Sequence, residues 1–172
     1  AFGMDISFYD PYKSDKKYSQ VLGLQDLFES NDVVLICPYL NEETMNSVTE
    51  SLFSEATSNL VLVNTSRGEV VSEEAIASAI SSNHLARYST DVLQGEITGS
   101  WKQSPLLNLA RTSPRVSITP HIAGLTTDSE SKAQLSALRM ALAILEELQR
   151  KYQFMCLTIT MRVILKMPWK VF

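Results

Sequence analysis

The 172-residue sequence has few of the residues that build disulfide frameworks and metal sites. It contains 2 cysteines and 2 histidines, which are Cys37, Cys156, His84 and His121. Their spacing matches no zinc-binding motif and leaves no disulfide framework. We therefore expect free thiols, no bound metal, a reducing compartment and, by default, the cytoplasm as the location.

Basic residues and long apolar runs are also scarce. Lys and Arg number 15 against 19 Asp and Glu, which gives a net charge of −4 and argues against nucleic acid as the main partner, since phosphate binding needs a basic face. The apolar stretch near the C-terminus is short and is interrupted by Arg162, so we expect no membrane span. A content of 45% apolar and 20% charged residues is ordinary for one globular domain with a full core.

Short apolar runs alternate with longer segments of helical period, which is typical of a parallel sheet with helices on both faces. The predicted strands cover about 5–9, 33–37, 60–64, 87–92 and 116–119. The predicted helices cover 24–30, 72–82 and 128–151, with one or two more within 43–53. Ser72 is expected to cap its helix, with Glu73 and Glu74 at the helix's positive end.

Three segments that each follow a predicted strand carry the residues with chemical potential. Arg67 lies in 64–71, Glu96 in 91–96 and His121 in 119–124. An arginine can hold a carboxylate with two parallel hydrogen bonds, and a histidine beside a glutamate can exchange a proton with a hydroxyl. These residue types in this order predict a site for a 2-hydroxy acid.

The same three segments, together with residues 1–11, resemble the cofactor-binding domain of the D-isomer-specific 2-hydroxyacid dehydrogenases, a family that includes phosphoglycerate, D-lactate and hydroxypyruvate dehydrogenases. The resemblance covers about residues 1–145. It implies a Rossmann-type doubly wound parallel sheet and an NAD-dependent enzyme that interconverts D-2-hydroxy acids and 2-keto acids. It also implies a homodimer when the protein is full length.

The family's G-x-G-x-x-G turn, the strand before it and the substrate domain do not occur in these 172 residues. We therefore expect residues 1–150 to form a partial NAD-binding domain, truncated at its N-terminus and inactive alone. Residues 151–172 carry four basic residues and no acid, and they match nothing expected in the family. They are interpreted as a divergent C-terminus, a basic amphipathic surface segment or a simple packing element.

By resemblance, Arg67 orients the substrate carboxylate and polarises the keto oxygen, His121 exchanges the hydroxyl proton, and Glu96 favours the protonated imidazole. Asp10 would accept both ribose hydroxyls of NAD, which disfavours NADP, although an Asp-Pro turn is the competing interpretation. The implied cofactor-binding set is Asp10, Cys37, Pro38, Thr44, Thr65, Ser66, Arg67, Asp91, His121, Ala123 and Gly124.

Several alternatives remain open at this point. Asp91 would meet the nicotinamide carboxamide or ribose, or would simply cap its strand. Trp101 would lie at the mouth of the site or at a dimer contact, and His84 is expected to be an exposed helix cap. Some family members act as cofactor-sensing corepressors, so a regulatory protein on the same scaffold is one alternative function, and an inactive gene fragment is another.

Overall fold

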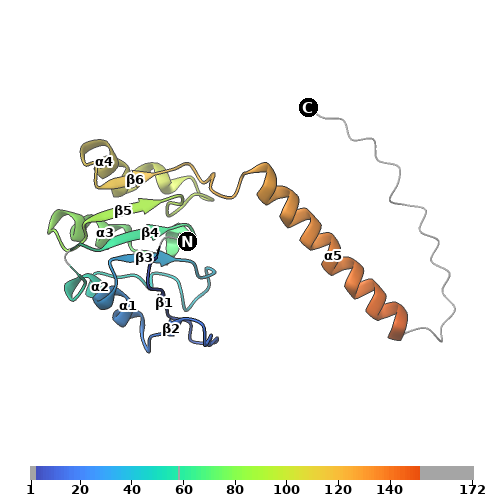
Figure 1. The fold of residues 1–172 in the computed structure, drawn as a ribbon. Coiled ribbons are helices and arrows are strands. Elements are labelled where there is room, and N and C mark those ends of the chain that lie inside the picture. Colours follow the sequence, from blue (N-terminus) through green and yellow to red (C-terminus); the bar gives the residue numbers. More distant parts are fainter. Residues whose placement is uncertain (1–2, 58, 152–172) are drawn as a thin grey trace. The chain divides into compact units, whose positions relative to one another are not determined.

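The computed structural model describes residues 3–57 and 59–151, and the chain divides into two units, Ala1–Gly124 and Leu125–Phe172. The second unit contributes the long helix α5 (Thr127–Lys151), and the first contains all of the strands (Figure 1). The strands are β1 (Ser7–Phe8), β2 (Ser19–Gln20), β3 (Val33–Ile36), β4 (Val61–Asn64), β5 (Arg87–Thr90) and β6 (Val116–Ile118). The helices between them are α1 (Leu24–Ser30), α2 (Ser51–Ser54), α3 (Glu73–Ser81) and α4 (Pro105–Thr112), with 3-10 turns η1 (Gly68–Val70) and η2 (Ser100–Gln103).

The strands form two parallel sheets. The larger sheet has four strands in the order β3-β4-β5-β6, and the smaller sheet pairs β1 with β2. All four registered pairs are parallel in their sheets, with Val33 opposite Val61 and Val61 opposite Arg87, for example. Consecutive parallel strands need a crossover, and α2, α3 and α4 provide it. The predicted α/β class with parallel strands is therefore confirmed.

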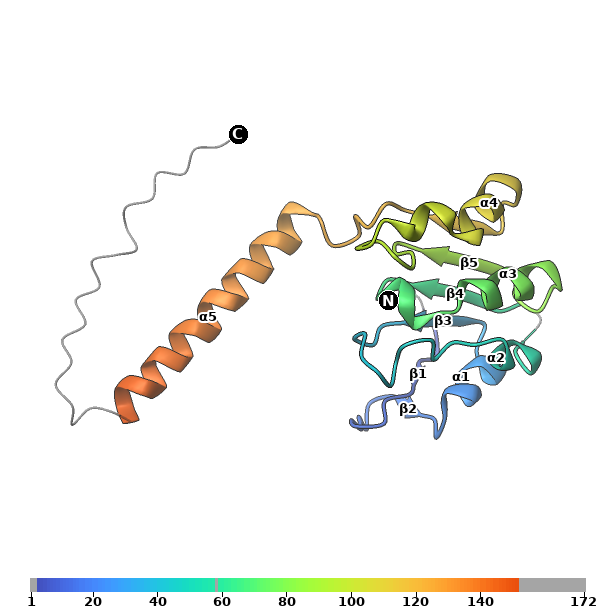
Figure 2. The ribbon, with the colours of Figure 1, turned by 180° about the vertical axis from the view of Figure 1, so that it is seen from behind.

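One face of the larger sheet is packed against helices. Alternate strand residues such as Val34 and Leu62 are buried and share one apolar core with Ile76 of α3. Phe28 of α1 meets Phe53 of α2 edge to face, with ring centroids 5.7 Å apart. Helix α3 lies behind the sheet in Figure 1 and in front of it in Figure 2.

The opposite face of β3 is not covered by a helix among the described residues of the first unit. Val33 is 39% exposed and Leu35 is 64% exposed, while their neighbours in the strand are buried. A fully wound parallel sheet buries both faces of such a strand. The expectation of helices on both faces is thus met on one face of β3 only.

The edges of the strands show where the two sheets would meet a further strand. Strand β4 is paired on both sides, by β3 and β5, so it has no free edge. Strands β1 and β3 each have one edge that pairs with no strand of the described residues. If a strand precedes β1 in a doubly wound order, its neighbours would be β1 and β3.

Helix boundaries follow local capping chemistry. The predicted helix 24–30 matches α1, and α3 begins at Glu73 because the Oγ of Ser72 accepts the N–H of Ala75. The predicted helix over 43–53 is wrong for most of its length. Asn46 has a φ of 50°, which interrupts helical geometry, and only α2 at its end is helical.

Two elements were not predicted from the sequence. Ser104 caps helix α4, because its Oγ accepts the N–H of Leu106, and Pro105 occupies the first position of the helix. Both are ordinary helix-start signals, so the sequence contained the information. Strand β2 is two exposed residues long, too short for any periodic signal. The predicted tail 151–172, with Cys156, lies outside the described residues apart from the last residue of α5.

Candidate active site

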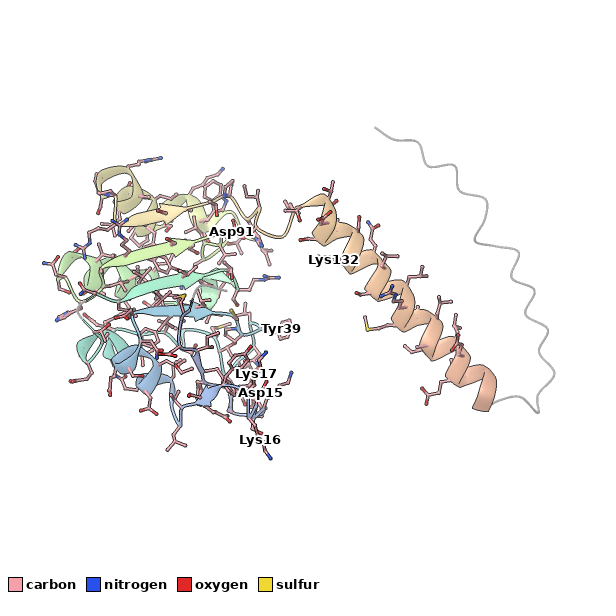
Figure 3. All side chains as sticks on the ribbon, viewed as in Figure 1. Asp15, Lys16, Lys17, Tyr39, Asp91 and Lys132 are labelled. Carbon is pink, nitrogen blue, oxygen red and sulfur yellow. The ribbon has the colours of Figure 1, made fainter. Side chains whose placement is uncertain are left out.

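Predicted site residues follow the carboxyl ends of all four strands of the larger sheet and of β1 in the smaller sheet. Asp10 follows β1, Cys37 follows β3, Thr65 follows β4, Asp91 follows β5 and His121 follows β6. The carboxyl ends of parallel strands lie at one edge of a sheet, which is where α/β proteins bind ligands. Figure 3 shows Asp91 and Tyr39, which follow β5 and β3, at this same edge.

His121 and Glu96 form an ion pair across this edge. The Nδ1 atom of His121 lies 2.6 Å from Oε2 of Glu96, and the two side chains are 48% and 32% exposed. The other carboxylate oxygen of Glu96 accepts the N–H of Leu93 at 2.8 Å. Both oxygens of Glu96 are therefore engaged, one fixing its own loop and one fixing the imidazole. The Nε2 atom is the ring nitrogen that this pairing leaves for a ligand.

Asp91 bonds to residues on both sides of His121. Its carboxylate accepts the Thr119 hydroxyl at 2.5 Å, the Ile122 N–H at 3.0 Å and the Ala123 N–H at 2.9 Å. His121 itself has a φ of 53°, a left-handed conformation that costs energy for a residue with a Cβ. The bonds to Asp91 stabilise that conformation and so aim the imidazole.

The same bonds set the charge of Asp91. Burial opposes the ionised carboxylate, but the hydrogen bonds from Thr119, Ala123 and Ile122 and the nearby charge of His121 outweigh it, so the pKa of Asp91 lies below its ordinary value. These contacts are those of a strand-capping aspartate, the alternative left open above. Its predicted contact with a cofactor stays a prediction.

Arg67 stands on a loop that Asn64 holds rigid. The amide Nδ2 of fully buried Asn64 donates to the carbonyl oxygen of Arg67 at 2.9 Å, and its Oδ1 accepts the N–H of Ser66 at 3.0 Å. The Ser66 hydroxyl donates to the carbonyl oxygen of Pro38, which ties this loop to the one after β3. The exposed guanidinium donates to the Ser66 carbonyl at 2.7 Å. Asn64 was not predicted as a site residue, although an amide at the end of an apolar strand was a visible signal.

The loops of Arg67 and Glu96 touch through their backbones. Gly68 packs so closely on Leu93 and Gln94 that no Cβ atom fits there. The structure therefore brings the predicted catalytic residues to one edge, with His121 and Glu96 in direct contact and the Arg67 loop against the Glu96 loop.

The residues predicted for the adenosine end lie after β1 and β3. Asp10 accepts the N–H groups of Tyr12 and Lys13 on one oxygen, at 2.8 and 3.0 Å, so it does initiate a turn. Its second oxygen takes no part in these two hydrogen bonds, and the residue lines a cavity of about 260 Å³. Thr44 donates from Oγ1 to the Tyr39 carbonyl at 2.6 Å and thereby closes the loop 39–44.

The remaining predicted residues are at the surface. Cys37, Pro38, Thr65, Ala123 and Gly124 are exposed. The thiol of Cys37 is free. Exposure of this kind suits residues whose backbone or small side chains would meet a ligand, although the Ala123 N–H and the Pro38 carbonyl oxygen already bond to Asp91 and Ser66.

A second cavity, of about 560 Å³, adjoins the ion pair. Glu96 and His121 line it together with Trp101 of η2, Arg111 of α4 and several apolar side chains of α4 and β6. This position of Trp101 agrees with the mouth of the site, which is one of the two places predicted for it. His84 is exposed after α3, with Nδ1 3.0 Å from the Ser82 hydroxyl, as expected for a residue outside the site.

The described residues contain neither a membrane-spanning helix nor a cluster of metal ligands. No helix between residues 3 and 151 is long and apolar enough to cross a membrane. No three His, Cys, Asp or Glu side chains in that range come together in a way that could hold a metal ion.

Comparison with known proteins identifies the domain. Residues 1–123 match the model of the "D-isomer specific 2-hydroxyacid dehydrogenase, NAD binding domain" family. The chain is 30% identical over 150 residues to D-3-phosphoglycerate dehydrogenase of Mycobacterium tuberculosis, which covers 83% of this chain and 27% of that protein.

Solved structures agree with this match. D-lactate dehydrogenase of Aquifex aeolicus, complexed with NAD and lactic acid, is 26% identical with a TM-score of 0.67, covering 85% of this chain and 47% of that one. A D-isomer specific 2-hydroxyacid dehydrogenase of Lactobacillus delbrueckii ssp. bulgaricus in its NAD-complexed form shares the fold, with a TM-score of 0.72 at 24% identity over 84% of this chain and 46% of that one. The chain thus spans about half the length of these structures and about a quarter of the curated relative. It belongs to the D-isomer specific 2-hydroxyacid dehydrogenase family, and the part that matches is the family's NAD-binding domain.

Proposed function

We propose that this domain supplies the cofactor site and the catalytic residues of an NAD-dependent oxidoreductase that acts on the CH–OH group of a D-2-hydroxy acid and, in reverse, reduces a 2-keto acid. The observation that carries the proposal is the 2.6 Å ion pair between His121 and Glu96, placed at the ligand-binding edge of a parallel sheet. In this proposal the full-length protein is a homodimer, as the family resemblance suggests, and lies in the cytoplasm, as the low cysteine content suggests.

NAD fits the residues at this edge. Asp10 at the end of β1 offers a carboxylate to the ribose hydroxyls, and the small exposed residues Ala123 and Gly124 beside His121 leave room for a flat ring. Thr65, Ser66 and the backbone of Cys37 and Pro38 complete the proposed set. When bound, the nicotinamide would accept or donate the hydride of the reaction.

The proton moves through His121. In the direction of reduction, the imidazolium donates the proton on Nε2 to the oxygen of the forming hydroxyl, and in oxidation the neutral ring accepts it. The carboxylate of Glu96 at Nδ1 stabilises the charged ring in both directions. Arg67 binds the substrate carboxylate with two parallel hydrogen bonds, which presents the keto carbon in a fixed orientation.

The test is kinetic. In a form of the protein in which a strand and a G-x-G-x-x-G helix precede residue 1 and a family substrate domain is present, we expect His121→Ala to lower turnover of a 2-keto acid by roughly 10² to 10⁴, because it removes only proton transfer. NADH affinity, measured by fluorescence titration, should change little.

His84→Ala is the matched control, since His84 is the other histidine and lies outside the site. It should leave turnover unchanged. Turnover of the pure His121→Ala variant close to that of the unaltered enzyme would contradict the catalytic assignment. An unaltered protein that binds NAD yet turns over no 2-hydroxy or 2-keto acid would favour the regulatory alternative.

A further inference from the structure

Three consecutive backbone N–H groups in the loop that carries Glu96 are held by three glutamates. The N–H of Leu93 donates to Glu96 at 2.8 Å, that of Gln94 donates to Oε1 of Glu73 at 2.8 Å, and that of Gly95 donates to Oε1 of Glu69 at 3.1 Å. A side-chain oxygen that accepts a backbone N–H satisfies a donor that would be costly to leave unpaired. Two of the three acceptors lie outside the loop, so it is anchored to another part of the chain.

Glu73 is an unusual residue to find in this place. The sequence predicts it as one of two acids at the positive end of α3, yet it is only 4% exposed, whereas its neighbour Glu74 is exposed. Burial raises the pKa of Glu73 even though hydrogen bonds from Ser104 and the Gln94 N–H act in the opposite direction. A buried carboxyl group is costly unless hydrogen bonds use it, and the bond to Gln94 is such a use.

The anchoring segment is the one that carries Arg67. Within 67–73, Gly68 lies against the backbone of Leu93, and the Val71 carbonyl accepts the side-chain amide of Gln94 at 2.6 Å. With Glu69 and Glu73, four residues of this segment contact the loop 93–96. The two loops are thus fixed to each other at several points along their length.

We propose that Glu73 and Glu69 are positioning residues that hold the loop 93–96, and with it the Glu96 carboxylate, in register with His121 and with the segment that carries Arg67. The proposal rests on the catalytic roles proposed above. A displacement of about 1 Å of a catalytic group can reduce the rate about 10²-fold, so a loop that holds Glu96 in place matters for turnover. Neither residue touches the reacting atoms.

Hydrogen–deuterium exchange measured by mass spectrometry tests the positioning role of Glu69 and Glu73 in the 172-residue chain at low concentration. Amide exchange of the peptide containing 93–96 reports on the loop. Exchange of the imidazole C2 proton of His121 reports on its pairing with Glu96, with His84 in the same chain as the internal reference. Glu96→Gln, which removes the charged partner directly, sets the size of the response expected at His121.

We expect Glu69→Ala and Glu73→Ala to speed amide exchange of the loop by about tenfold or more, since each leaves an N–H without its acceptor. Both should move C2 exchange of His121 toward the Glu96→Gln value and leave His84 unchanged. Glu73→Gln keeps an acceptor oxygen and should behave as the unaltered chain. Glu74→Ala is the matched control and should change neither rate.

Unchanged loop and His121 exchange in both alanine variants would overturn the proposal. Faster loop exchange with an unchanged His121 signal would also overturn it, because the loop would then not position the pair. If Glu73→Ala unfolds, all of its peptides will exchange rapidly. The Glu69→Ala variant then tests the proposal by itself, because Glu69 is only half-buried.

Turnover of the completed enzyme separates this proposal from the proposed function. If exchange responds as expected and the unaltered enzyme reduces no 2-keto acid, the positioning role of Glu69 and Glu73 is supported and the proposed function is wrong. If the enzyme is active and Glu69→Ala changes neither kcat nor its pH profile, the function stands and the positioning role fails.

Discussion

Gly68 lies directly on the peptide between Leu93 and Gln94, at a distance that leaves no space for a Cβ atom. We therefore predict that Gly68→Ala destabilises the domain by about 1–3 kcal/mol or more, because the clash is with backbone, which cannot rotate away as a side chain can. Denaturant unfolding should show a lower midpoint.

Gly124→Ala is the control for this prediction, because a Cβ atom at Gly124 meets nothing within 4 Å. Both changes add the same methyl group, and only the first adds it between two loops. Equal unfolding midpoints for the two variants would show that the loops separate easily and are not in the close contact described.

The sequence predicted the α/β class, α1 and the start of α3 from periodicity and local capping. The contact of His121 with Glu96, 25 residues apart, was implied only by the family resemblance. The sequence could not predict Glu73, whose burial depends on a loop 21 residues further along the chain. From local sequence, Glu73 and Glu74 are equivalent acids in the first turn of a helix. Only tertiary packing distinguishes them.

The helix predicted over 43–53 failed for a related reason. The side chain of Asn41 accepts the N–H groups of Glu43 and Thr44, as a helix cap does, but the left-handed Asn46 ends the turn that follows. The backbone N–H of Asn46 donates to the Glu69 carbonyl, a long-range bond that no propensity scale contains. The site loop after β3 is therefore shaped by contacts with the Arg67 segment.

We predict that Asp91→Asn destabilises the domain at neutral pH by about 1–3 kcal/mol, because an amide cannot accept the three hydrogen bonds of the carboxylate. The effect should depend on pH. The pKa of Asp91 is lowered on folding, so the ionised carboxylate stabilises the fold at any pH above its ordinary pKa of 3.8. This stabilisation is lost as the pH falls through the folded-state pKa.

The difference in unfolding free energy between Asp91→Asn and the unaltered chain should therefore become smaller as the pH is lowered below 3.8. Unfolding free energies measured between neutral and acid pH test this. Asp5→Asn, at an exposed position, should show no such narrowing. A difference that stays constant with pH would mean that the charge of Asp91 does not stabilise the His121 loop.

For Arg67 we predict that Arg67→Lys raises KM for the 2-keto acid strongly and lowers kcat, although the charge is retained. An ammonium group cannot reproduce the planar two-point contact of a guanidinium with a carboxylate. Steady-state kinetics of the completed enzyme measure it, with Arg87→Lys on β5 as an exposed control. Identical kinetics for the lysine variant and the unaltered enzyme would exclude the carboxylate-binding role.

Asp10 should determine the choice of cofactor. A carboxylate at the end of β1 accepts ribose hydroxyls and repels a 2′-phosphate, so we expect a preference for NAD over NADP that weakens in Asp10→Ser. The ratio of kcat/KM for the two cofactors is the measurement. Equal use of NAD and NADP by the unaltered enzyme would refute this role, and Asp10 would then be only the turn residue that its bonds to Tyr12 and Lys13 already make it.

The last prediction concerns the open edges of β1 and β3. Exposed edges with apolar side chains pair readily with other chains, and Leu35 of β3 is 64% exposed. We expect the 172-residue chain to self-associate as its concentration rises, and to bind NAD weakly or not at all, because the glycine-rich turn that holds a pyrophosphate does not occur in it.

Sedimentation velocity over a range of concentrations and calorimetric titration with NAD test both parts. Leu35→Lys should reduce self-association, since a charge on the open strand disfavours intermolecular pairing. Ile97→Lys removes an equally apolar and fully exposed side chain away from β3 and should have little effect. Adding a strand and a G-x-G-x-x-G helix before residue 1 should suppress association and restore NAD binding together. A monomer that binds NAD with micromolar Kd without them would show that this chain closes its sheet by another route.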